Sequence, residues 1–126
     1  MREEIANWYR QAGRDLISAS NSLNSGDFYL SVFMSQQAVE KGLKAIVLTK
    51  FRNKFIPEHS LIKLGKKVNI PKRYHVALKK LSPQYFLARY PDASEDVPFE
   101  LYDKEVALEF LNMAKEVFAW INKQLE

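Results

Sequence analysis

The chain has no cysteine, and this absence removes several classes of function at once. Disulfide bridges, thiolate nucleophiles and cysteine-based zinc sites are all excluded. Only two histidines are present, His59 and His75, and zinc normally takes three or four protein ligands. We therefore expect no metal site and no cofactor. The four glycines are scattered singly, which also excludes a Walker loop and a dinucleotide-binding fingerprint.

Long apolar runs and strand-like alternation are missing as well. The longest central apolar run, residues 45–48, is far too short to span a bilayer. The polar N-terminus is unlike a signal peptide, so we expect a cytoplasmic protein without membrane contact. With 126 residues, 47% of them apolar, the chain is predicted to form one domain over residues 1–126. Its net charge of +4 favours an anionic partner, although a lysine-rich surface also serves solubility.

Apolar residues recur every three or four positions, which is the pattern of amphipathic helices. The first such segment covers residues 2–24 and the second covers residues 28–50. Between them, Gly26 suits a left-handed C-cap position and Asp27 suits the next N-cap. So short a connection requires the first two helices to lie antiparallel.

The second half of the chain is predicted to be helical too. We expect Ser60 or the residue before it to cap a short helix and Asp103 to cap the last one. Pro83 kinks or divides the region between these two helices. Residues 91–98 have the composition of an acidic loop. The helices expected here cover residues 60–66, 71–86 and 104–125. The predicted fold is all-α, an antiparallel four-helix bundle with one short additional helix.

Residues 36–45 combine charges with small side chains inside the second predicted helix. Glu40 and Lys44 stand four apart with the acid first, the favoured order for an ion pair within a helix. Asp15 lies beside the buried stripe of the first helix, so its carboxylate needs a partner, and Lys41 or Lys44 is the natural candidate. Three small residues at helical spacing would let another backbone approach closely: Ala38, Gly42 and Ala45.

Four motifs in a fixed order carry a family resemblance. They are Trp8…Ala12-Gly13-Arg14-Asp15-Leu16…Ala19, then residues 36–45, then His59-Ser60-Leu61…Leu64, and finally Arg89-Tyr90-Pro91-Asp92. Together they resemble the HEPN family of small helical domains, named for higher eukaryotes and prokaryotes nucleotide-binding. The resemblance runs from about Ile5 to Leu125. It implies the same bundle architecture and a homodimer whose paired helices make a shared groove.

HEPN ribonucleases carry an Arg-x4–6-His motif, in which arginine steadies the phosphate and histidine helps to move a proton of the attacking ribose. Arg52 and His59 match that spacing, with six residues between them. The match lies in the loop after the second predicted helix, whereas the family's nucleases carry the motif near the start of a late helix. The last predicted helix has neither arginine nor histidine. We therefore expect feeble RNA cleavage or none, with Arg52 and His59 as the catalytic candidates.

A nucleotide site in this chain must use side-chain cations and helix N-termini, because no glycine-rich phosphate loop exists. Pro91 keeps Tyr90 out of helical conformation, so Arg89 and Tyr90 lie where a helix ends. A guanidinium and an aromatic face suit a phosphate and a base. The alternative is that Arg89 pairs with a carboxylate and Tyr90 packs on the bundle. The candidate nucleotide-binding set is Lys41, Lys44, His59, Arg89 and Tyr90. The three cations and His59 are expected around one cleft.

Three functions remain open from the sequence. The resemblance to stand-alone prokaryotic HEPN proteins favours a nucleotide- or RNA-binding accessory domain. It would act with a small nucleotidyltransferase in a toxin–antitoxin-like pair. The second possibility is a metal-independent endoribonuclease, and the third is a helical adaptor without a ligand. Two Trp, six Tyr and eight Phe are many for a thin bundle, which favours a homodimer interface.

Overall fold

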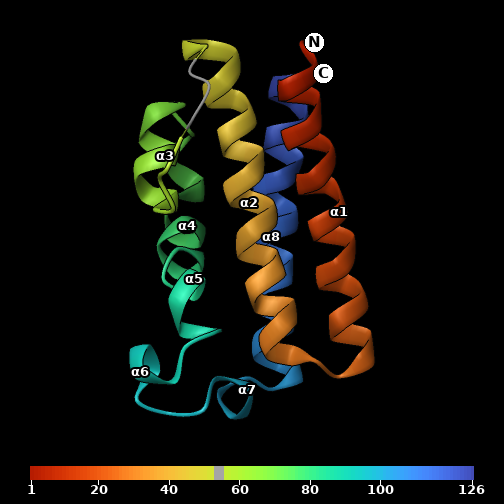
Figure 1. Ribbon diagram of the computed structural model, residues 1–126, viewed down its shortest axis with the longest axis vertical. Coiled ribbons are helices and arrows are strands. Elements are labelled where there is room, and N and C mark those ends of the chain that lie inside the picture. The colour runs from red at the N-terminus through yellow and green to blue at the C-terminus, as the bar shows by residue number, and fades with distance from the viewer. Residues whose placement is uncertain (53–55) are drawn as a thin grey trace.

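The computed structural model describes residues 1–52 and 56–126. Three long helices, α1 (Glu3–Ser25), α2 (Phe28–Phe51) and α8 (Lys104–Leu125), lie side by side. A column of short helices packs beside α2, and both chain termini lie at the same end of the bundle (Figure 1). The short elements are α3 (Leu61–Lys67), the 3₁₀ turn η1 (Lys72–Tyr74), α4 (His75–Leu81), α5 (Gln84–Leu87), α6 (Pro91–Ser94) and α7 (Pro98–Leu101).

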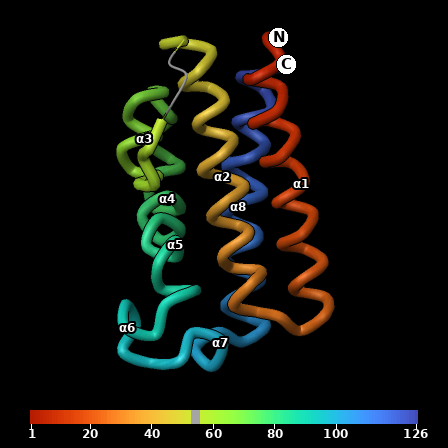
Figure 2. Tube along the Cα trace, viewed as in Figure 1, coloured from red at the N-terminus to blue at the C-terminus, as the bar shows by residue number. Residues whose placement is uncertain are grey.

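The described residues contain no strand, so the all-α prediction is confirmed. The tube in Figure 2 shows that the fourth member of the bundle is a broken column rather than one continuous helix. The predicted helix over residues 71–86 is divided into η1, α4 and α5, with Pro83 just before α5. Proline cannot donate the backbone hydrogen bond that a continuous helix needs, and its ring crowds the preceding turn. The sequence had left kinking and division open, and the structure shows division.

The structure corrects the prediction of a loop over residues 91–98. This acidic stretch begins with α6, and α7 starts at its end. Each of these single turns has a proline in its first turn, where the missing N–H costs nothing and the fixed φ suits the helix. Tyr90, before Pro91, is extended with φ −115° and ψ 122°, as the residue preceding a proline should be.

The helix ends follow from particular residues. Gly26 adopts φ 88° after α1, and the following N–H of Asp27 returns to the Ser22 carbonyl, which closes the left-handed cap. Asp27 occupies the N-cap position of α2, but its side chain makes no capping hydrogen bond. Ser60 and Asp103 do cap through their side chains, accepting from N–H groups three residues later.

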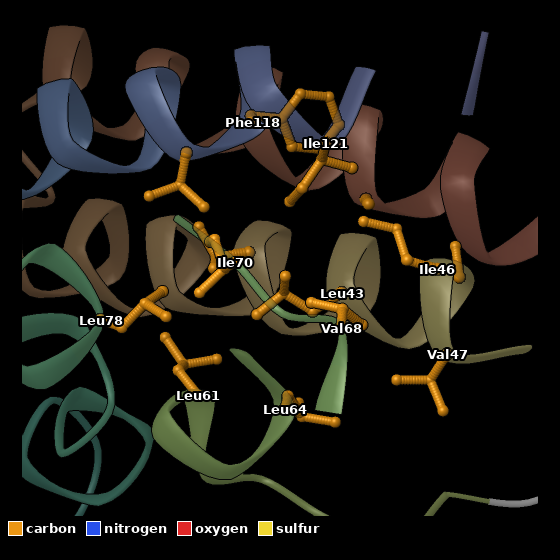
Figure 3. Packing of buried hydrophobic residues seen from close by; sticks show 14 of the residues in the cluster. Leu43, Ile46, Val47, Leu61, Leu64, Val68, Ile70, Leu78, Phe118 and Ile121 are labelled. Atoms are coloured by element: carbon orange, nitrogen blue, oxygen red, sulfur yellow. The ribbon is translucent and has the colours of Figure 1, made fainter. Parts of the chain in front are cut away.

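Helix α2 is the centre of the molecule. It is buried on nearly all sides because it packs against α1, α8, α3, α5 and α7. Gly42 lets α8 come close, since an added Cβ there would lie only 2.8 Å from Ile121 Cδ1. Leu43 of α2, Leu61 of α3 and Leu78 of α4 belong to one buried cluster, part of which Figure 3 shows from close by. This core holds the broken column against α2 and thereby positions the candidate site.

Candidate functional site

A charged pair is buried in the middle of α2. Glu40 is 3% exposed and Lys44 is 4% exposed. Lys44 Nζ lies 3.1 Å from Glu40 Oε2, and the Gln36 side-chain amide donates to Glu40 Oε1 at 3.1 Å. Lys44 Nζ also lies 5.4 Å from the centre of the Trp8 ring on α1. The predicted ion pair is therefore formed, and it is desolvated, so each charge depends on its partner.

His59 connects this buried pair to the broken column. Its Nδ1 lies 3.3 Å from Glu40 Oε1 and 3.2 Å from Oε2. An ionised carboxylate can only accept, so Nδ1 must carry the proton in this contact. In a neutral ring Nε2 is then an acceptor, and the Tyr85 hydroxyl lies 3.3 Å from it. Glu40 therefore fixes both the position of the imidazole and its tautomer.

Aromatic rings continue the chain of contacts from His59 to Arg89. The imidazole and the Tyr85 ring stack, with centroids 4.1 Å apart and 17° between their planes. The guanidinium carbon of Arg89 lies 4.3 Å from the Tyr85 centroid and 4.7 Å from those of Phe33 and Tyr90. Arg89 Nε donates to the Tyr85 carbonyl at 2.7 Å. Rings on three sides suit arginine because its planar guanidinium is weakly hydrated and stacks well.

A groove of about 380 Å³ opens beside His59 and Tyr85. Its lining comes from the start of α3 and from the α4–α5 junction: Pro57, Glu58, His59, Ser60, Ser82, Pro83, Tyr85 and Phe86. The His59 side chain is 44% exposed, while Phe86 and Tyr90 are 53% and 44% exposed. Buried contacts thus hold these groups while their outer faces remain open. The groove offers an imidazole, hydroxyl groups and the exposed ring of Phe86.

Glu58 shapes the mouth of the groove. Its Oε2 accepts the backbone N–H of Ser60 at 3.0 Å and that of His59 at 3.1 Å. The Ser60 N–H does most to lower the pKa of Glu58, with help from Lys63 and the His59 N–H and against partial burial. A lowered pKa means that this contribution to stability is present at neutral pH and is lost as the pH falls through that pKa.

The structure brings together some of the predicted nucleotide-binding residues. Lys44 and His59 meet at the same carboxylate oxygen, Glu40 Oε2. Arg89 and Tyr90 join them through the Tyr85 ring. Within the described residues, Arg89 has no carboxylate within ion-pairing distance, so aromatic stacking replaces the salt bridge that the sequence had left open.

Lys41 lies elsewhere. Its Nζ is 2.5 Å from Asp15 Oδ2 on α1, which forms one of the two pairings predicted for that aspartate. Gln11 donates to the other carboxylate oxygen of Asp15. Lys41 lines a separate open hollow together with α1 residues: Glu4, Asn7, Trp8 and Gln11. The structure therefore does not place Lys41 in the groove beside His59.

Arg52 and His59 are also kept apart. Arg52 is exposed at the C-terminal end of α2, in left-handed conformation with φ 55°. Glu40, which holds His59, lies twelve residues earlier in the same helix, about 18 Å along the axis at 1.5 Å per residue. Part of the segment between the two residues, 53–55, lies outside the described residues. The spacing match does not bring this arginine and this histidine to one cleft.

Several functional contacts were not predicted from the sequence. The sequence did not identify Glu40 as the hydrogen-bond partner of His59. Tyr85, Phe33 and Phe86 were not predicted as site residues. The spacing of Tyr85 and Arg89 at i and i+4 was the available signal, although it becomes informative only once α5 is known to begin after Pro83. No group of three histidine or acidic side chains suited to a metal occurs in residues 1–52 and 56–126.

Removing Glu40 should expose how strongly the site depends on it. Glu40→Leu leaves the Lys44 ammonium buried without a partner, and we expect a loss of about 3–5 kcal/mol in the free energy of unfolding. Glu40→Leu/Lys44→Met removes both charges and should recover much of that loss. Denaturant unfolding measures each value. Glu4→Ala, which breaks an exposed pair with Arg2, is the control and should change stability by less than about 1 kcal/mol. Equal losses in the single and double variants would contradict the buried-pair interpretation.

Comparison with known proteins identifies the family and supports the fold. The chain is similar to the crystal structure of TT1696 from Thermus thermophilus, with 30% identity and a TM-score of 0.87 over 98% of this chain and 99% of that one. It is similar to ST0689, an archaeal HEPN homologue, with 30% identity and a TM-score of 0.78 over the full length of both chains. No curated protein matches the chain. The sequence model of the HEPN domain matches residues 5–124, and the chain therefore belongs to the HEPN domain family.

Proposed function

We propose that this protein is a HEPN-type accessory domain that binds a nucleotide or RNA in the groove beside His59. The observation that carries the proposal is the position of Arg89, stacked against three aromatic rings next to that groove. Two of the nearby rings, Phe86 and Tyr90, are 53% and 44% exposed. A base can stack on such a face while the guanidinium attracts the phosphate.

The site favours binding over catalysis. The only Arg-x4–6-His match uses Arg52, which lies about three helical turns from the part of α2 that holds His59. His59 Nδ1 is engaged by Glu40, so at most Nε2 is open to a ligand, and Tyr85 competes for it. A metal-independent endoribonuclease using Arg52 and His59 therefore stays the alternative with less support.

We further propose how the domain works with other chains. Family membership supports a minimal nucleotidyltransferase as the partner in a toxin–antitoxin-like pair. In this proposal residues 1–126 form one domain, and the domain acts in the cytoplasm. No helix in the described residues is both long and apolar enough to cross a membrane. A homodimer is supported by apolar side chains exposed at α7 and near the start of α8: Val97, Phe99, Leu101 and Leu108. An adaptor without a ligand stays an alternative only if the groove binds nothing.

Binding should depend on Arg89 and Phe86. Titration of a fluorescently labelled single-stranded RNA hexamer, followed by anisotropy, should show affinity that falls several-fold between about 50 and 200 mM salt. Arg89→Gln and Phe86→Ala should each weaken binding roughly tenfold, because stacking contributes about 1–3 kcal/mol per base. Arg10→Gln, an exposed change on α1, is the matched control.

The same titration separates the three functions. The RNA should be recovered intact in the presence of a chelator. Rapid cleavage that Arg52→Ala and His59→Ala both abolish, with folding unchanged, would favour the nuclease. If the affinity is equal at both salt concentrations, or if no binding is detected, the adaptor without a ligand becomes the favoured function.

The protein should be a symmetric homodimer. Its interface is expected to be largely apolar and to bury more than roughly 1,000 Å². Light scattering at tens of micromolar protein should give twice the chain mass of 14.7 kDa. Phe99→Glu places a charge on the exposed apolar surface and should shift the mass toward the monomer. A monomer mass for the unchanged protein contradicts the prediction.

A further inference from the structure

A further hollow of about 230 Å³ is lined by residues of α3, of α4 and of the turn between them. These two helices form the upper part of the broken column in Figure 1. Half of its lining is apolar and half can carry positive charge: Ile62, Ile70 and Leu78, with Lys66, His75 and Lys79. None of these residues lines the groove beside His59. The two hollows are therefore separate features of the same column.

The buried side of the hollow is formed by two apolar side chains, Ile70 and Leu78, which we call its apolar floor. Ile70 and Leu78 are 5% and 2% exposed. Both pack against α3 at Gly65, where an added Cβ would lie 2.6 Å from Leu78 Cδ1 and 3.0 Å from Ile70 Cγ2. Asn69 turns the chain with φ 55°, and the Ile70 N–H then returns to the Gly65 carbonyl at 3.0 Å. Figure 3 shows Ile70 and Leu78 within the packed cluster that holds this floor in place.

The rim of the hollow is positively charged and uncompensated. Lys66 and Lys79 are exposed in the last turns of α3 and α4, and His75 is half-buried at the start of α4. Among the described residues, no carboxylate pairs with either lysine. The reason lies in the sequence, because residues 59–91 contain eight Lys or Arg and no Asp or Glu. The segment that supplies the rim therefore contributes no negative charge of its own.

We propose that this hollow is a second binding site, which takes a small organic anion with a short apolar body. Its apolar floor matches one aromatic ring or a short alkyl chain, and the two lysines match a phosphate or carboxylate on that body. Drug-sized ligands occupy pockets of about 300–1,000 Å³, so a hollow of 230 Å³ restricts the ligand to a smaller body. Such a ligand would link α3 to α4 and leave the groove beside His59 free.

Phenyl phosphate is the direct probe, because it joins one ring to one phosphate. Titration into the intact ¹⁵N-labelled protein should give saturable amide shifts confined to residues around 62–79. Inorganic phosphate supplies only the anion and benzyl alcohol supplies only the ring. Each should bind at least about fivefold more weakly than phenyl phosphate. Lys66→Gln/Lys79→Gln should weaken binding of phenyl phosphate about tenfold or more, since a hydrogen bond to a charged group contributes roughly 1.5–3 kcal/mol.

The matched control is Lys63→Gln/Lys80→Gln, which removes two exposed charges from the same helices outside the hollow. It should change the affinity less than about twofold, because screening weakens charges that make no direct contact. Ile62→Trp fills the hollow without changing its charge and should also abolish binding. Equal weakening by both lysine pairs, shifts located outside residues 62–79, or no saturation at millimolar concentrations would each overturn the proposal.

Discussion

A carboxylate buried in the middle of α2 is the constraint on which the site depends. Glu40 cannot be left without partners in the core, because an unpaired buried charge costs several kcal/mol. Its partners come from two directions: Gln36 and Lys44 from its own helix, and His59 from the segment that precedes α3. The same contacts that satisfy Glu40 therefore tie the broken column to α2 and orient the imidazole toward Tyr85. The need to pair the buried Glu40 carboxylate therefore also determines the geometry of the groove beside His59.

The broken column gives the bundle its concave surfaces. A continuous fourth helix would present one regular face, whereas the division before Pro83 exposes a junction between α4 and α5. At that junction Ser82 accepts the Leu61 N–H, and α5 directs Tyr85 toward His59. The turn at Asn69 leads into Ile70, which lines the proposed second site between α3 and α4. Both candidate sites thus lie where the helical periodicity fails, and the three long helices act as their scaffold.

The long elements of this fold could be predicted because they depend on local signals. Apolar periodicity located α1, α2 and α8, while Gly26, Ser60 and Asp103 marked helix ends. The Asp15–Lys41 and Glu40–Lys44 pairs followed from the cost of burying a charge. The division of the fourth helix was less predictable, since Pro83 allowed either outcome. The cage around Arg89 could not be predicted, because Phe33 is more than fifty residues away in sequence and reaches it only through tertiary packing.

Nitrogen NMR of the His59 ring tests the central claim most directly. If Glu40 holds this ring, Nδ1 must carry the proton when the imidazole is neutral, and Nε2 must be unprotonated. His75, which has no hydrogen bond to a carboxylate among the described residues, serves as the internal reference. The account predicts the Nδ1–H tautomer for His59 in the intact protein and its loss in Glu40→Leu. A neutral His59 with the proton on Nε2, or the same spectrum in both proteins, would contradict it.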